Sequence, residues 1–257
     1  MRALLWSLAA LLCVALTALV FFPASWLTYK VETETGGRLT LGDPQGTLWR
    51  GSAFVGGAPG KGDPVTPLLP GRFSWKLSPM ALLGKVDMEL ENQESLSQPL
   101  QITGTWSQWQ VSGASVNLPA DRLAALGAPL NTIQPSGRMQ LSWGPLLVVQ
   151  HGATVAVTGA TQLELSDMSS RLSNIKPLGA YHVGVQWNGD TAHLELKSTS
   201  GPMLLSGQGD LNLNRGQFHF SGQAEAEAGQ EQRLANLLNL LGQRQRIGDK
   251  DVFALKL

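Results

Sequence analysis

The chain has 257 residues, and its 19 basic and 19 acidic side chains give a formal net charge of zero at pH 7. Nucleic-acid binders usually carry a basic excess or a basic stripe, so this balance argues against that class of protein. The single cysteine, Cys13, excludes an intrachain disulfide and a thiolate metal site. An exported domain of this chain would therefore depend on its own core for stability.

The first predicted element is an apolar run from Ala3 to Leu27 that contains no charged residue. At ~1.5 Å per residue, about 20 helical residues cross the hydrocarbon core of a bilayer. A cleaved signal peptide would have a shorter apolar core and a small-residue cleavage site, and neither feature is found here. The run favours an uncleaved anchor over residues 1–29, with the β-rich domain, 30–257, in the periplasm and the short N-terminus in the cytoplasm.

A stretch rich in glycine and proline follows at 56–71, with the sequence GGAPGKGDPVTPLLPG. Glycine widens the allowed backbone space and proline removes hydrogen-bond donors, so we expect a flexible loop without helix or strand ladder. Its segment 57–62 is only superficially like a phosphate-binding loop, because glycine rather than serine or threonine follows Lys61.

Beyond this loop, apolar and polar residues alternate with a period of two in many short runs. This alternation is typical of strands with one face on a core and one face in water. Fully buried parallel strands would be apolar throughout, so a mostly antiparallel sheet is favoured. The clearest runs lie at 72–77, 86–91, 138–143, 181–187, 194–196, 211–213 and 218–220.

Two turn signals predict the register of two hairpins. Asn188-Gly189 is a strong signal for a two-residue turn, and Arg215-Gly216 is treated in the same way. The predicted pairs are Val185 with Ala192, Val183 with Leu194, Leu213 with Phe218 and Leu211 with Phe220. With this register His182 lies opposite Glu195.

Two segments have helical spacing. Residues 119–126 form a short candidate that ends at Gly127, and 230–241 form a longer one that ends at Gly242. The longer helix carries one apolar stripe, made of Leu234, Leu237, Leu238 and Leu241. Such a stripe either packs on the core or docks a partner, so these four leucines are candidate contact residues.

Together these elements predict a mainly β protein: an N-terminal transmembrane helix, then a large, curved, mostly antiparallel sheet with one or two short helices. Trp106 and Trp109 are three residues apart, so they cannot share one face of a regular strand. One of them is therefore expected to be exposed, and both are candidate partner contacts.

No pattern in the chain indicates catalysis. The four histidines do not have the spacing of metal ligands, and no nucleophile elbow of the Gly-x-Ser-x-Gly type is present. We therefore expect a protein that is not an enzyme and holds no metal or cofactor. The histidines are His151, His182, His193 and His219.

A series of short motifs follows the apolar run in a fixed order. They are GTLWRG at 46–51, FSWKLSP at 73–79, LPA at 118–120, GAPLNT at 127–132, GRMQLSW at 137–143, LGAY at 178–181, GPMLLSG at 201–207 and QFHFSG at 217–222. In this order they resemble the type II secretion system protein N family over nearly the whole chain. Residues 56–71 match no feature of that family.

The resemblance implies a single-pass inner-membrane protein with a periplasmic domain. It implies an accessory component of the machine that exports folded proteins through the outer-membrane secretin. Contacts with the secretin and with inner-membrane platform proteins follow from the same resemblance. The family is not regarded as enzymatic and supplies no catalytic residue.

Two functions remain open at this point. The first is a scaffold of the secretion apparatus, recruited through an exposed sheet edge or another surface. The second is a membrane-tethered protein whose curved sheet holds lipid acyl chains on its apolar face. What covers that face distinguishes them, because a covered face is a core and an open face is a ligand site.

Overall fold

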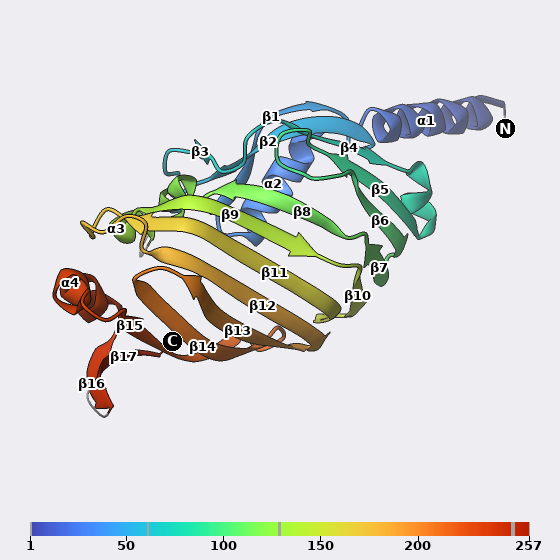
Figure 1. The fold of residues 1–257 in the computed structure, drawn as a ribbon. Helices are drawn as coiled ribbons and strands as arrows, with labels where there is room; N and C mark the ends of the chain where they lie inside the picture. Colours follow the sequence, from blue (N-terminus) through green and yellow to red (C-terminus); the bar gives the residue numbers. More distant parts are fainter. Residues whose placement is uncertain (1, 61, 128–129, 248–249, 257) are drawn as a thin grey trace.

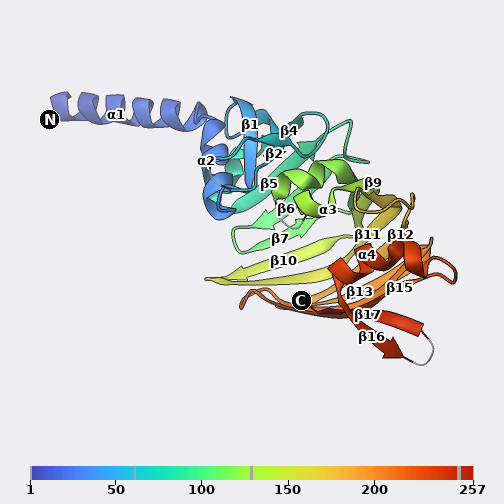
Figure 2. The same ribbon diagram turned by 90° about the vertical axis from the view of Figure 1, so that its left-hand side faces the viewer.

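The fold was obtained as a computed structural model, which describes residues 2–60, 62–127, 130–247 and 250–256. It is a strongly curved antiparallel sheet with a few helices around it, and one helix projects away from the sheet (Figure 1, Figure 2). The predicted mainly β, antiparallel fold is therefore confirmed.

The apolar N-terminal run is divided between two helices, α1 (Arg2–Val20) and α2 (Ser25–Glu34). Pro23 lies between them and forms an isolated bridge with Thr47, and the lack of an N–H on proline favours such a break. The apolar run from Ala3 to Leu27 is therefore not one continuous helix. Across the described residues, no helix is both long enough and apolar enough to cross a membrane.

In the part of the chain that the structure describes, the first half of the sheet contains eight strands. They are β1 (Leu39–Gly46), β2 (Arg50–Gly57), β3 (Thr66–Pro67), β4 (Phe73–Leu77), β5 (Lys85–Glu91), β6 (Leu100–Thr105), β7 (Gln108–Val111) and β8 (Ala114–Pro119). Two short 3-10 helices interrupt or follow them, η1 (Pro79–Leu83) and η2 (Ala120–Leu126). The predicted short helix at 119–126 thus corresponds to η2.

The second half begins after α3 (Leu130–Ile133) and includes the longest strand, β11 (Thr154–Ser170). Its other described strands are β9 (Pro135–Trp143), β10 (Leu146–His151), β12 (Gly179–Gly189), β13 (Thr191–Ser200), β14 (Met203–Asn212), β15 (Gln217–Ala226), β16 (Gln243–Ile247) and β17 (Lys250–Lys256). Helix α4 (Glu231–Leu241) lies between β15 and β16 and confirms the predicted helix at 230–241.

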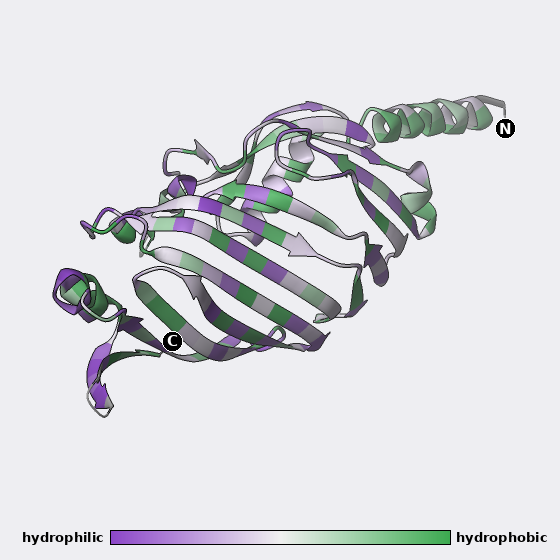
Figure 3. Cartoon of the chain, in the orientation of Figure 1, coloured by the Kyte–Doolittle hydropathy of each residue, from purple (hydrophilic) through white to green (hydrophobic). Residues whose placement is uncertain are grey.

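Most strands pair with their neighbours in sequence, so the sheet is largely an up-and-down meander. β7 pairs with β10 and β8 with β9, and β11 is long enough to pair with both β10 and β9. At the C-terminal side β17 inserts between β15 and β16. Figure 3 shows hydrophobic and hydrophilic residues alternating along β11 and β12, as the period of two predicts.

Both predicted hairpin registers are wrong by two residues, although their apolar and polar faces are right. Trp187 rather than Val185 lies opposite Ala192, and Leu211 rather than Leu213 lies opposite Phe218. The first turn is built on Gly189, whose φ is +69°. A shift of two residues leaves every side chain on its face, so alternation alone cannot exclude it.

The remaining predicted pairs shift with these registers. Val183 lies opposite Leu196 instead of Leu194, and His182 lies opposite Lys197 instead of Glu195. The glycine- and proline-rich stretch also differs from expectation. Thr66 and Pro67 pair with the end of β2, so a short ladder does form there, and a proline is tolerated in such a minimal strand. Residue 61 of this stretch lies outside the described residues.

Two separate core clusters lie on the apolar face of the sheet. In the first, Ala24 before α2 packs with Ala53 of β2 and Trp75 of β4. In the second, α4 covers Tyr181 and Met203 near the ends of β12 and β14. The two clusters are built around helices at opposite parts of the molecule (Figure 1).

The apolar face between the clusters is continuous from strand to strand. Leu163 of β11 lies opposite both Leu141 of β9 and Val183 of β12, and Val185 pairs with Leu194 of β13. These five side chains are half-buried. They belong to neither core cluster among the residues that the structure describes.

Candidate functional site

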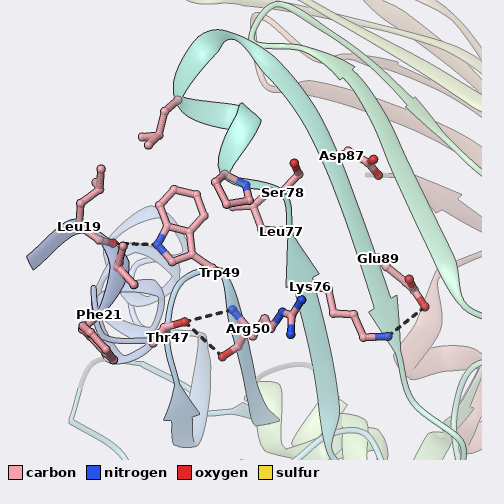
Figure 4. A pocket seen from close by; sticks show the side chains of 13 residues that line it. Leu19, Phe21, Thr47, Trp49, Arg50, Lys76, Leu77, Ser78, Asp87 and Glu89 are labelled. Carbon is pink, nitrogen blue, oxygen red and sulfur yellow. Dashed lines mark hydrogen bonds and ion pairs between the residues drawn. The ribbon is translucent and has the colours of Figure 1, made fainter. Parts of the chain in front are cut away.

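The candidate site is a cleft of about 690 Å³ between the end of α1 and the sheet (Figure 4). Four parts of the chain form its walls: the end of α1, the β1–β2 turn, the β4–η1 segment and β5. The lining residues are Leu19, Val20, Phe21, Thr47, Trp49, Arg50, Lys76, Leu77, Ser78, Pro79, Leu82, Asp87 and Glu89. We call this feature the α1 cleft.

Trp49 connects the helix to the sheet. It is half-buried, and its indole Nε1 donates a hydrogen bond to the carbonyl oxygen of Leu19 at 2.7 Å. The main-chain N–H of Leu48 donates to the carbonyl oxygen of Phe22 at 2.8 Å. These bonds satisfy carbonyl groups around the end of α1 that have no partner within the helix. The β1–β2 turn therefore holds the chain where it leaves α1.

The GTLWRG motif has the residues that this turn requires. Gly46 has a φ of +82°, a conformation that glycine adopts without steric cost. A Cβ atom on Gly51 would lie 2.5 Å from the Trp75 ring, so that position is restricted to glycine by close packing. The motif noted in the sequence thus builds one wall of the α1 cleft.

The charged side chains at the rim of the α1 cleft largely neutralise one another. Nζ of Lys76 lies 3.6 Å from Oε1 of Glu89 and 3.5 Å from Oε1 of Glu91. The pKa of Glu89 is lowered because the neighbouring Glu91 side chain hydrogen bonds to it, with a smaller contribution from Lys76. All three groups are exposed enough for salt to screen them. The cleft has no strong excess of either charge.

η1 forms the outer wall of the α1 cleft and is capped at both ends. Ser78 Oγ accepts a hydrogen bond from the Met80 N–H at 3.3 Å, and Gly84 ends the turn with a φ of +89°. Trp106 lies in the loop between β6 and β7, and its indole Nε1–H donates a hydrogen bond to the carbonyl oxygen of Ala81. The loop and η1 are thereby joined.

The structure separates the residues proposed as partner contacts. Trp106 is 64% exposed, whereas Trp109 is half-buried in β7, so Trp106 is the exposed member of the pair. Leu234, Leu237 and Leu238 are buried against the sheet, and Leu241 packs at the margin of the same cluster. The tryptophans and the α4 leucines lie far apart in the fold (Figure 1).

The exposed residues of η1 are not among the contacts predicted from the sequence. Met80, Leu82 and Leu83 are exposed at 48%, 46% and 78%. The available signal was the apolar segment between Ser78 and Gly84, which lacks the alternation of a strand. Its exposure depends on the turn that the Ser78 cap and Gly84 define, and that geometry is not visible in the residue pattern.

The polar face carries two histidine–carboxylate pairs. His182 Nδ1 lies 2.5 Å from Oε1 of Glu164, and His193 Nδ1 lies 3.0 Å from Oδ1 of Asp210. Within the described part of the chain, no group of three or more histidine, cysteine, aspartate or glutamate side chains is placed to hold a metal ion.

The family model for type II secretion system (T2SS), protein N, matches residues 37–251. This range includes every strand from β1 to the start of β17. The chain belongs to the type II secretion system protein N family. The match confirms the resemblance inferred from the ordered motifs, and it rests on the sheet rather than on α1. Searches of curated proteins and of solved structures gave no significant match.

Membership of the protein N family gives the α1 cleft a context. The chain is a relative of components of a secretion machine, which supports an accessory role in type II secretion and interaction with other components of that system. The GTLWRG turn lies inside the matched range, while α1, the helix that it holds, lies outside it.

Proposed function

We propose that this chain is a non-catalytic scaffold of the type II secretion system, anchored in the inner membrane with its sheet in the periplasm. The observation that carries the proposal is the family match over residues 37–251. The secretin and the inner-membrane platform proteins are the partners that this kinship suggests. In this role the protein supports passage of folded periplasmic proteins through the secretin.

The anchoring part of the proposal rests on α1. The helix projects from the sheet (Figure 2), and its large apolar side chains are exposed, including Leu8, Leu11 and Val14 at 63%, 70% and 69%. Exposing these side chains to water is unfavourable, and contact with lipid would remove that cost. We therefore assign α1 to the inner membrane, with the segment after it packed on the sheet at the membrane surface.

A deletion of the gene tests the secretion role. Secreted hydrolases should accumulate in the periplasm of the deletion strain, and the full chain supplied in trans should restore their export. Replacing residues 1–20 by a cleavable signal peptide provides the matched variant, because it removes α1 and keeps Ala24 and Leu27, which pack on the sheet. Normal hydrolase export in the deletion strain would contradict the secretion role, and full activity of the unanchored sheet would contradict the need for α1.

The half-buried apolar stripe supports a second candidate function, the holding of lipid acyl chains. Leu141, Leu163, Val183 and Leu194 line β9 to β13 without belonging to a core cluster. An acyl chain along this stripe would bury the part of it that water reaches. Mass spectrometry of the purified full chain should then detect bound phospholipid.

A pair of matched substitutions distinguishes specific from incidental lipid binding. Val183→Gln alters the apolar face, whereas Gln162→Ala alters a neighbouring position on the polar face of β11. The first should reduce the amount of bound lipid and the second should leave it unchanged. Equal lipid content in both variants and the unmodified chain would contradict this second function.

A further inference from the structure

An exposed apolar patch lies beside the α1 cleft. It consists of Met80, Leu82 and Leu83 of η1 together with Trp106, whose exposed fractions are between 46% and 78%. Single exposed apolar side chains are common on protein surfaces, but these four gather on one short turn and the loop bonded to it. We call them the η1 patch.

The η1 patch has a fixed shape. The main-chain N–H of Ser78 donates to the Asp87 carbonyl oxygen at 2.8 Å, and the N–H groups of Ala81 and Gly84 close the turn with bonds of 3.0 and 3.2 Å. The hydrogen bond from Trp106 to Ala81 ties the loop to the same turn. The turn that presents these side chains is thus held by the sheet on one side and by the loop on the other.

The η1 patch is continuous with α1. Leu82 and Pro79 line the same cleft as Leu19, Val20 and Phe21 at the end of the helix. Figure 1 shows η1, the turquoise coil, on the side of the sheet from which α1 projects. Figure 4 shows Trp49 between the helix end and the η1 side of the cleft. The surface of a bilayer that holds α1 would therefore lie close to the η1 patch.

We propose that the η1 patch docks on the surface of the bilayer that holds α1, so that the sheet is attached to the membrane at two points. This inference rests on the proposed anchoring of α1. Tryptophan side chains favour the interface between headgroups and acyl chains, and leucine and methionine side chains favour the acyl region beneath it. The composition of the patch fits both layers.

The charges near the η1 patch indicate which lipids it takes. Lys76 is paired with Glu89 and Glu91, and the remaining basic groups nearby, Arg50 and Lys85, stand against Asp87 and the surplus carboxylate of that group, so the local charge is balanced and does not favour anionic headgroups. The docking is therefore driven by apolar insertion. Zwitterionic and anionic bilayers should support it equally, and salt should have little effect.

The test uses the full chain in nanodiscs, with Cys13→Ser removing the native thiol. A fluorescent NBD group is attached to Leu83→Cys in the patch, to Leu11→Cys in α1, or to Leu240→Cys on α4. Leu240 is the matched control, because it is a leucine 58% exposed on a helix remote from the patch. Spin-labelled phosphatidylcholine then reports which probes lie in lipid by quenching them.

We expect quenching at positions 83 and 11 and none at position 240, with or without anionic lipid. Quenching at position 11 but not at 83 would overturn the second attachment while leaving the anchor intact. Absence of quenching at both positions would overturn the anchoring and this inference together. If the probe at position 83 is shielded from water but not quenched by the spin-labelled lipid, and if the shielding disappears on dilution, the patch contacts a second copy of the chain instead of the bilayer.

A second measurement keeps the probe at one position and changes the other side chains of the patch. With the probe at Met80→Cys, the substitutions Leu82→Ser and Leu83→Ser should abolish quenching while the chain stays in the nanodisc. Leu240→Ser serves as the control and should leave quenching unchanged. Both changes are at exposed positions, so the fold is retained. Unaltered quenching in the double variant would contradict docking through the patch.

Discussion

Helix α4 provides the sharpest test of how the sheet is stabilised. Leu238 is 1% exposed within the second core cluster, whereas Leu240, on the same helix, is 58% exposed. Leu238→Ala loses about 2 kcal/mol of transfer free energy, and the cavity left behind adds about 1 kcal/mol. We therefore expect the free energy of unfolding to fall by about 3 kcal/mol.

Leu240→Ala is the control for this substitution. It makes the same chemical change on the same helix, but its side chain is largely in water already, so we expect a change within about 0.5 kcal/mol. Urea unfolding of the full chain in detergent, followed by far-ultraviolet circular dichroism, gives both values.

Equal losses in the two variants would refute the assignment of α4 to the core. Docking of a partner would then be the better explanation of the stripe formed by Leu234, Leu237, Leu238 and Leu241. In that case Leu238→Ala would reduce hydrolase export while the free energy of unfolding stayed unchanged. The two measurements together therefore separate packing within the chain from contact with another protein.

Three further predictions follow from single contacts. Gly207→Ala should lower the free energy of unfolding by about 1–3 kcal/mol, measured in urea, because the new Cβ would lie 2.4 Å from the Phe220 ring. Gly144→Ala is the control and should have little effect, because the space around Gly144 is open. Burial raises the pKa of Tyr181, so at alkaline pH its phenol stays protonated in the native chain but ionises in the unfolded chain. The free energy of unfolding should therefore fall above about pH 10, by up to about 1.4 kcal/mol per pH unit. The Tyr181→Phe variant should lose this part of the pH dependence, and an identical alkaline profile would contradict the assignment. Trp49→Phe removes the hydrogen bond to the end of α1, so amide exchange just after the helix should quicken, and unchanged exchange would count against the proposed clamp.

Much of the sheet was predictable because alternation is a local property of the chain. The runs around Trp75, Met88, Leu141 and Val183 are all strands with the predicted face toward the apolar side. The stripe on α4 was predictable for the same reason, since a period of 3.6 residues fixes which side chains share a face. The ordered motifs identified the family, because they record these strands and turns in sequence.

Register was not predictable from the same evidence. Phe220 lies opposite Gly209 and over Gly207 and Gly222, a placement that gives the ring space among three glycines. The turn signal at Arg215-Gly216 favoured a pairing two residues away, with Leu211 opposite Phe220. Both registers keep apolar residues on one face, so packing of the ring had to decide between them.

Periodicity and hydropathy, which are properties of each residue and its neighbours, were enough to predict a one-sided antiparallel sheet behind an apolar segment. The folded chain was needed to show that the apolar segment divides at Pro23, that α4 closes one core, and that η1, with Trp106 bonded to it, lies beside the end of α1. Those features depend on contacts between residues distant in sequence. The packing and hydrogen bonds that stabilise them join segments that the chain brings together only in the folded sheet.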